Sequence, residues 1–178
     1  APADHLYTRP EALEAAISAA AEAARSTGAL VTLGIHPSRP ETSFGYIEID
    51  PEGPVGLPAG VRRALRFVEK PDAPTARTWL ATGRHLWNSG IFIWRVGAIL
   101  EAIERCAPDL WQGMMEIDRA LGGPGEDDAV ARVFEKLASI SIDYAVMEKA
   151  PHVLVVPADP GWSDVGSWAA LSEVLARD

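Results

Sequence analysis

The sequence has few of the features that mark secreted or membrane proteins. Its 178 residues include one cysteine, Cys106, which cannot form an internal disulfide and points to a reducing compartment. No apolar run approaches the roughly 20 residues that cross a bilayer, and the first ten residues lack a basic segment followed by an apolar one. We therefore expect a cytoplasmic protein with no signal peptide and no membrane partner.

Basic residues are also scarce. The 16 Lys and Arg residues are outnumbered by 25 Asp and Glu residues, which gives a net charge of −9. Binding to nucleic acid depends on Lys and Arg side chains that neutralise phosphates, so we expect no nucleic-acid partner. For the same reason, a chain this acidic needs a metal cation or a few well-placed basic groups if it handles anionic phosphates.

Several catalytic and metal-binding patterns are missing as well. Three histidines, His36, His85 and His152, show no metal-ligand spacing with one another or with Cys106, so we predict no zinc site. No Ser-His-Asp arrangement stands out, and no Gly-rich phosphate loop occurs in these residues. The candidate chemistry therefore rests on carboxylates and other polar groups at predicted strand ends.

The sequence does contain an alternation of short apolar strands with helices, uninterrupted by repeats or by a domain boundary. We expect a helix that Thr8 caps, that has Pro10 in its first turn and that ends at Gly28. The other predicted elements are strands at 29–35, 44–50, 61–69, 86–96 and 153–159, and helices at 72–83, 97–106, 108–121, 126–137 and 167–177. This alternation predicts the α/β class with a mixed, mostly parallel sheet.

Two aspartates near the chain ends are candidate metal ligands. Asp164 lies in GWSDVGSW (161–168), where flanking glycines allow the backbone to aim its carboxylate, although the same position suits a cap for the next helix. Asp4 lies in PADH (2–5); PAD recurs at 157–159 after a predicted strand, so Asp4 is either a strand-end carboxylate or a solvated terminal residue. Together the two carboxylates suit Mg²⁺, which usually binds one or two carboxylates and substrate phosphates.

Three further stretches offer polar groups to a ligand. In FVEKPD (67–72), Glu69 and Lys70 are either a surface pair or ligands for sugar hydroxyls and a phosphate, respectively. Asn88 in WNSGIF (87–92) either satisfies a backbone bulge or offers a donor and an acceptor to a sugar. Gly45 in FGYI (44–47) weakens its strand unless another group approaches the backbone closely.

Taken together, these stretches resemble the sugar-nucleotide pyrophosphorylase family, and within it the mannose-1-phosphate guanylyltransferase branch. No single stretch is specific, but six occur in the family's order and cover nearly the whole chain. The six are PADH (2–5), LVTLGIHPSRPETSFGYIE (30–48), RFVEKPD (66–72), WNSGIFIW (87–94), SIDYAVMEK (141–149) and GWSDVGSW (161–168).

The resemblance implies a fold, a reaction and a set of site residues. The implied fold is a three-layer, Rossmann-like nucleotide-diphospho-sugar transferase with helices on both faces of the sheet. In the implied reaction, mannose 1-phosphate attacks the α-phosphorus of GTP and yields GDP-mannose and pyrophosphate. Asp4 and Asp164 would bind the catalytic Mg²⁺, and Lys70 would contact the sugar phosphate. The resemblance assigns the sugar pocket to Gly45, Glu69 and Asn88, with supporting roles for Asp143 and Tyr144.

The resemblance extends only to the second part of the family's catalytic domain. We therefore expect residues 1–178 to be the sugar-binding and metal-binding part of that domain, without the N-terminal nucleotide-binding half and its Gly-rich turn. We also expect the isolated chain to be inactive, with an exposed sheet edge and apolar surface that favour association, as in a homodimer.

Three alternatives remain open at this point. The first is a nucleotidyltransferase that acts on another sugar 1-phosphate. The second is a non-catalytic regulatory subunit that senses GDP-mannose, and the third is a structural α/β domain whose motifs are coincidental. The order of the six stretches argues most strongly against the third.

Overall fold

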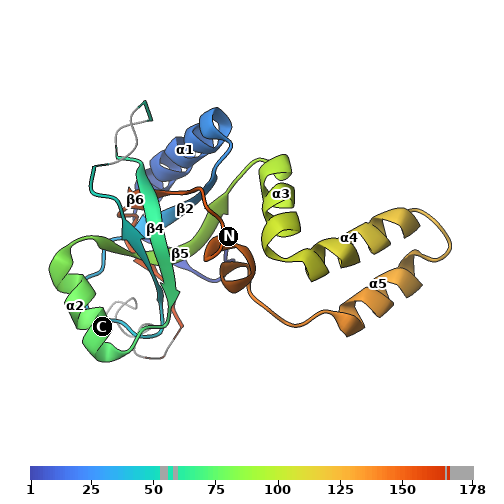
Figure 1. The fold of residues 1–178 in the computed structure, drawn as a ribbon. Helices are drawn as coiled ribbons and strands as arrows, with labels where there is room; N and C mark the ends of the chain where they lie inside the picture. Colours follow the sequence, from blue (N-terminus) through green and yellow to red (C-terminus); the bar gives the residue numbers. More distant parts are fainter. Residues whose placement is uncertain (53–55, 58–59, 167, 169–178) are drawn as a thin grey trace. The chain divides into compact units, whose positions relative to one another are not determined.

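The computed structural model describes residues 1–52, 56–57, 60–166 and 168, and it divides the chain into two compact units. The first unit contains residues 1–94 and 152–178, and the second contains residues 95–151 (Figure 1). No boundary signal marks either junction in the sequence. The union of both units in one catalytic domain, expected from the resemblance, stays a prediction. The predicted C-terminal helix at 167–177 lies outside the described residues.

Five strands of the first unit form a closed ring in the order β2–β5–β3–β4–β6. The ring closes because β6 pairs with β2 on one side and with β4 on the other. Each strand occupies its predicted position to within three residues. The bounds are Leu30–Ile35 for β2, Gly45–Ile49 for β3, Arg62–Glu69 for β4, His85–Ile93 for β5 and Val153–Ala158 for β6.

The prediction of a mixed sheet is confirmed, but the prediction that it is mostly parallel is wrong. Among the strand pairs of the ring in the described residues, only β2 with β6 is parallel, and the other four pairs are antiparallel. No helix lies between β3 and β4 among the described residues of their connection, and the two strands pair directly in antiparallel fashion. A closed ring also differs from the expected open sheet with a helix layer on each face.

The long helix α1, Pro10–Thr27, packs on β2 and β6 through small side chains. Its C-terminus agrees with the sequence, because Gly28 adopts φ 72° and donates its N–H to the Ala24 carbonyl. The prediction that Thr8 caps the helix is wrong. Arg9 occupies the cap position, and the Thr8 hydroxyl instead donates to the Gly161 carbonyl at 3.3 Å. The alanines buried on the inner face are Ala16, Ala20, Ala23 and Ala24.

The short helix α2, Ala73–Thr82, confirms its predicted cap, because Asp72 Oδ1 accepts the Thr75 N–H at 2.9 Å. Its far end packs against His85, the first residue of β5 and itself buried. The imidazole stacks on Trp79 with ring centroids 4.7 Å apart. Burial lowers the pKa of His85, which outweighs the opposing effect of the Glu48 carboxylate.

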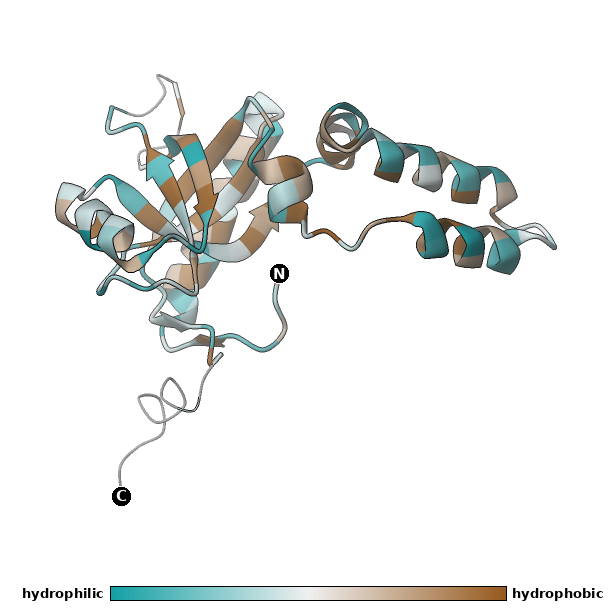
Figure 2. Cartoon of the chain, turned by 60° about the horizontal axis from the view of Figure 1, so that its bottom comes forward, coloured by the Kyte–Doolittle hydropathy of each residue, from teal (hydrophilic) through white to brown (hydrophobic). Residues whose placement is uncertain are grey.

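The second unit is helical. It contains α3 (Val96–Cys106), α4 (Pro108–Ala120) and α5 (Glu126–Lys136), all at their predicted positions. Figure 2 shows α4 and α5 alternating between hydrophobic and hydrophilic residues along their lengths, as expected for an amphipathic pair. A short π-helix, η1 (Asp143–Met147), was not predicted. None of the helices in the described part of the chain is long and apolar enough to cross a membrane.

A two-stranded ribbon joins residues from near the two ends of the chain in the first unit. Strand β1, Leu6–Tyr7, pairs antiparallel with β7, Trp162–Ser163. The pairing continues where the Thr8 N–H donates to the Gly161 carbonyl at 3.2 Å. Strands this short have no readable periodicity, so the sequence did not predict the ribbon. It places the PADH and GWSDVGSW stretches side by side.

Candidate functional site

Three of the residues predicted to line a sugar pocket meet on neighbouring strands. Gly45 of β3 pairs directly with Glu69 of β4. On its other side, β3 pairs with β5 in a register that, continued by one residue, sets Gly45 opposite Asn88. Residues opposite each other in a sheet share a face. The strand register therefore places Gly45, Glu69 and Asn88 next to one another, and their role as a sugar pocket stays a prediction.

Gly45 lies at the centre of this group and has no room for a side chain. An added Cβ would overlap Glu69 Oε2 and would lie 3.5 Å from Asn88 Cβ. The missing side chain thus allows the Glu69 carboxylate to lie across the backbone of β3. This explains the glycine within the strand, which the sequence identified as a point of close approach.

Lys70 follows Glu69 at the end of β4 in an unusual backbone conformation, with φ 50°. Its N–H donates to the Phe44 carbonyl at 3.2 Å, which ties the turn to the start of β3. Adjacent strand residues normally point to opposite faces. Here the Lys70 ammonium instead lies 3.8 Å from Glu69 Oε1, and the lysine side chain is 64% exposed. An exposed cation thus stands at the rim of the group around Gly45.

Asn88 lies where β5 bulges, as the Asn-Ser-Gly sequence predicted. Between the pairs Thr32–Phe92 and Gly34–Asn88, β5 contains two more residues than β2. Asn88 Oδ1 accepts the Thr32 hydroxyl at 3.3 Å and the Gly90 N–H at 3.2 Å. The amide therefore satisfies the bulge, which is the structural role that the sequence left open. The same bonds fix the side chain beside Gly45.

The ribbon brings the segments that contain Asp4 and Asp164 next to each other. Asp4 lies two residues before β1, and Asp164 directly follows β7. The N-terminal segment also contacts the bulge of β5, because a Cβ on Gly90 would lie 3.2 Å from Pro2 Cγ. Asp4 therefore belongs to a segment that runs from the Asn88 bulge to β7. It is exposed, and Asp164 is half-buried.

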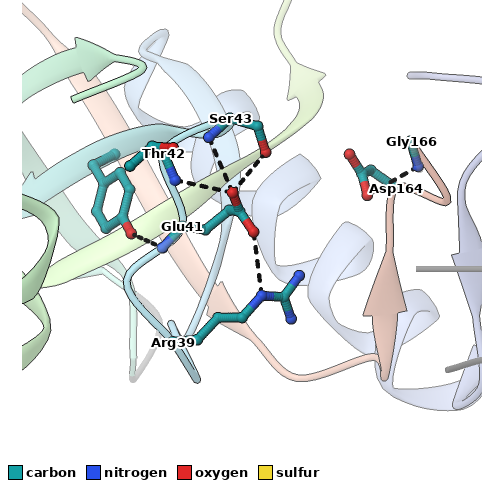
Figure 3. Close-up of polar contacts among 7 residues, drawn as sticks. Arg39, Glu41, Thr42, Ser43, Asp164 and Gly166 are labelled. Carbon is teal, nitrogen blue, oxygen red and sulfur yellow. Dashed lines mark hydrogen bonds and ion pairs between the residues drawn. The ribbon is translucent and has the colours of Figure 1, made fainter. Parts of the chain in front are cut away.

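The chain turns back on itself after Asp164, and Figure 3 shows the Gly166 N–H bonded to the Asp164 carboxylate. Asp164 Oδ1 accepts the Gly166 N–H, and Ser163 Oγ accepts the Val165 N–H, both at 3.2 Å. Val165 adopts φ 49°, which is rare for a β-branched residue. A Cβ added at Gly166 would lie 2.6 Å from Asp164 Oδ2, so a larger residue there would displace the carboxylate. The Gly166 N–H thus orients one oxygen of the carboxylate.

The two carboxylates are compatible with a magnesium site. In the part of the chain that the structure describes, no group of three or more His, Cys, Asp or Glu side chains is arranged to hold a metal ion. Zinc and calcium sites normally need such a set of protein ligands. Mg²⁺ binds through one or two carboxylates together with water and substrate phosphates, and the assignment of Asp4 and Asp164 as its ligands stays a prediction.

An aromatic cluster connects the ribbon to the strands around Gly45. Trp162 of β7 packs edge-on against Phe44, with ring centroids 5.0 Å apart, and its indole N–H donates to His5 Nδ1 at 2.9 Å. Phe44 in turn packs against Trp87, with ring centroids 5.1 Å apart. Phe44 precedes Gly45 and Trp87 precedes Asn88. The cluster therefore holds the predicted metal segments and the predicted sugar residues at the same end of the strands.

A charged loop before β3 was missed by the sequence interpretation, which used residues 36–43 only as part of the 30–48 stretch and gave no role to their side chains. Glu41 Oε1 accepts the N–H groups of Thr42 and Ser43 and the Ser43 hydroxyl, at 2.9 to 3.2 Å. Glu41 Oε2 accepts Arg39 Nε at 3.2 Å (Figure 3). Burial alone would raise the pKa of Glu41, but these hydrogen bonds outweigh it and lower the pKa. The carboxylate is therefore ionised near neutrality.

The local sequence did contain a signal for this loop. Arg39 and Glu41 are an oppositely charged pair two residues apart, followed directly by two hydroxyl residues. A carboxylate accepts several hydrogen bonds, so the Thr42 and Ser43 donors and the Arg39 cation were candidate partners for Glu41. The supporting residues Asp143 and Tyr144 lie in η1 of the second unit, and their contribution to the site stays a prediction.

Comparisons with known proteins give one family. A family model described as nucleotidyl transferase matches residues 1–178. The xanthan biosynthesis protein XanB of Xanthomonas campestris pv. campestris is 41% identical over 181 residues, covering 99% of this chain and 37% of that protein. The mannose-1-phosphate guanylyltransferase ManC of Salmonella typhimurium is 40% identical, covering 98% of this chain and 36% of that protein.

Solved structures give the same pattern. A Thermus thermophilus protein described as mannose-1-phosphate geranyltransferase is 37% identical, with a TM-score of 0.83 over 99% of this chain and 49% of that chain. A mannose-6-phosphate isomerase from Helicobacter pylori is 30% identical, with a TM-score of 0.74 over 92% of this chain and 62% of that chain. The likeness supports the α/β fold of this class of enzymes. The chain spans about 37% of the length of the curated relatives that it matches.

Proposed function

Because this chain belongs to the nucleotidyl transferase family, we propose that it is the sugar-binding and metal-binding part of an enzyme that makes GDP-mannose. The substrates are mannose 1-phosphate and GTP, and the second product is pyrophosphate. The single observation that supports this most is the meeting of Gly45, Glu69 and Asn88 on three adjacent strands. Relatives about 40% identical and named mannose-1-phosphate guanylyltransferase support the choice of sugar and base.

The sugar is bound by the group around Gly45. The Glu69 carboxylate accepts hydrogen bonds from sugar hydroxyls, and the Asn88 side chain offers both a donor and an acceptor. Gly45 keeps the floor of the pocket flat, since any side chain there would displace Glu69. Lys70, exposed at the rim, pairs with the phosphate of mannose 1-phosphate and moves from Glu69 toward the substrate.

Asp4 and Asp164 would hold Mg²⁺. The ion, when bound, would neutralise charge on the phosphates of the two anionic substrates. The protein positions the two carboxylates for the ion. The ribbon aligns the two segments, and the Gly166 N–H orients Asp164.

The reaction is a nucleotidyl transfer, a substitution at phosphorus. As in phosphoryl transfer, the protein contributes by positioning the substrates and neutralising charge rather than by covalent chemistry. A phosphate oxygen of mannose 1-phosphate attacks the α-phosphorus of GTP and forms the new phosphorus–oxygen bond. The bond from the α-phosphorus to its β-bridging oxygen breaks, and pyrophosphate leaves with that electron pair. Lys70 holds the attacking phosphate in line with the α-phosphorus and the leaving pyrophosphate. The pocket around Gly45 holds the mannose ring.

Two measurements test this function. Isothermal titration calorimetry of this chain with GDP-mannose, GDP-glucose and GDP should give tightest binding to GDP-mannose, and Glu69→Ala should erase the preference over GDP-glucose. A protein that contains this chain should release pyrophosphate from GTP only with mannose 1-phosphate among several sugar 1-phosphates. Equal rates with glucose 1-phosphate would refute the assignment of mannose. Ligand binding without any pyrophosphate release would favour the sensing subunit instead.

The cellular setting stays a prediction. The reducing cytoplasm was inferred from the single cysteine and the homodimer from an expected exposed edge. The absence of nucleic-acid partners was inferred from the net charge of −9. Gel filtration with light scattering would test the homodimer directly.

A further inference from the structure

The loop before β3 presents a guanidinium that the roles proposed above do not use. Arg39 is 47% exposed along its side chain, so its end reaches solvent. Within the described residues, Nε bonded to Glu41 is the only guanidinium nitrogen of Arg39 in a hydrogen bond or ion pair. An arginine has five N–H donors, so the terminal nitrogens are available to a ligand.

Two contacts fix the direction of this guanidinium. The first is the bond to Glu41, whose carboxylate is itself held by Thr42 and Ser43. The second is the face of the Trp87 indole, whose ring centroid lies 5.7 Å from Arg39 Cζ. An exposed arginine usually samples many rotamers, and fixing it in advance reduces the entropy that a ligand must overcome. The arrangement therefore resembles a prepared binding group more than a solvated charge.

The surroundings of Arg39 connect it to the candidate site. Trp87 precedes Asn88 on β5, and its ring centroid lies 6.3 Å from that of Trp162. Trp162 lies two residues before Asp164 in the same stretch of chain. The loop of Arg39 leads into Gly45 at the start of β3. The guanidinium therefore lies at the end of the strands where the proposed sugar and metal residues meet.

We propose that Arg39 binds a phosphoryl oxygen of the substrate and that Glu41 is the positioning residue that aims it. The inference rests on the proposed function, because it presumes a phosphate at this end of the strands. The chain has a net charge of −9, so a fixed cation there counteracts the repulsion of an anionic substrate. The phosphoryl group comes either from the sugar phosphate or from pyrophosphate.

Calorimetry on the whole chain with two probes, mannose 1-phosphate and inorganic pyrophosphate, tests this directly. Arg39→Gln should weaken binding of one of them about 10- to 100-fold, the size of a lost charge-assisted hydrogen bond. The probe that is affected identifies the source of the phosphoryl group. Binding of mannose without phosphate should not change. Arg39→Lys should recover part of the loss, because it keeps the charge without the planar fork.

Glu41→Gln tests the positioning role. It removes the ion pair while Gln can still accept the loop N–H groups, so thermal unfolding should stay near that of the parent while phosphate binding weakens several-fold. Arg25→Gln is the control for charge, because Arg25 is also an exposed arginine paired with a glutamate, Glu22 of α1, and none of the proposed site residues lies in that helix. It should leave both affinities unchanged.

The outcomes separate the inference from the proposed function. If the parent chain binds a phosphate probe and Arg39→Gln binds it equally well, the inference is overturned while the function stands. If Arg25→Gln weakens binding as much as Arg39→Gln, the effect is one of net charge and the inference is again overturned. If neither probe binds to the parent chain, both proposals fail.

Discussion

Replacing Gly45 with alanine adds one methyl group at the centre of the proposed sugar pocket. The methyl carbon would overlap Glu69 Oε2, while its distance to Asn88 Cβ would be an ordinary 3.5 Å. The backbone of Gly45 does not adopt a positive φ, so alanine introduces no backbone strain. The whole perturbation therefore falls on the Glu69 carboxylate, which must move aside by about an ångström to restore normal contact.

The stability effect should be small and the binding effect large. Overpacking a well-filled site costs about 1–3 kcal/mol, but here the displaced group is the end of a side chain that is 20% exposed. We expect the lower limit, about 1 kcal/mol, and a fall in Tm of roughly 2–4 °C. A displacement of about 1 Å in a positioning group can weaken function roughly 100-fold, so mannose 1-phosphate binding should fall by a factor of 10 to 100.

A double-mutant cycle isolates the cause. In the Glu69→Ala background, Gly45→Ala should have almost no further effect on Tm or on affinity, since the overlapping carboxylate is gone. Gly97→Ala is the matched control, because a Cβ at Gly97 meets nothing within 4 Å; it should be neutral or stabilising by up to about 1 kcal/mol. If Gly45→Ala binds mannose 1-phosphate as tightly as the parent, the close approach of Glu69 has no role in the pocket.

Three other perturbations have defined outcomes. Asp164→Asn should weaken GDP-mannose binding in the presence of Mg²⁺ and not in its absence, and equal calorimetric affinities in both conditions would exclude it as a ligand. Because the pKa of His85 is lowered in the folded chain from its usual 6.5, unfolding takes up a proton as the pH falls below about 6.5. The free energy of unfolding measured with urea should therefore decline as the pH falls below about 6.5. His85→Gln should make this decline shallower. An unchanged dependence on pH in the variant would contradict the role of His85. Val165→Gly should raise Tm while weakening Mg²⁺-dependent binding.

Local chemistry made much of the first unit predictable from its sequence. The αL conformation of Gly28 ends α1, and the Asp72 carboxylate begins α2, because both depend on residues within one helical turn. The bulge at Asn88 was predictable because an Asn-Ser-Gly sequence interrupts an otherwise regular strand. Gly45 likewise indicated a close approach to the backbone of β3, because a glycine weakens a strand and is found there mainly where another group lies close.

Features that depend on distant partners could not be predicted from local patterns. The choice of antiparallel partners for β5 and the closure of β6 onto β4 join segments that are far apart in the sequence, and strand periodicity is the same for either direction. The hydrogen bonds of Glu41 were partly foreseeable, but its link through Arg39 to Trp87 depends on how β3 and β5 pair. The direction of the Lys70 side chain follows from the positive φ of this residue. That φ could not be predicted, because lysine has no preference for it.

The backbone strain in the described residues occurs at the two points where the site proposal needs precision. Lys70 and Val165 are the only non-glycine residues there with positive φ, at 50° and 49°, and each directly follows a proposed ligand, Glu69 or Asp164. Such a conformation costs of order 1–3 kcal/mol and persists only when the surroundings enforce it. If the strain served only the fold, glycine at 165 would stabilise the chain and leave metal binding alone. If it serves to aim Asp164, the same substitution stabilises the chain and loosens the carboxylate, so stability and Mg²⁺ affinity must change in opposite directions.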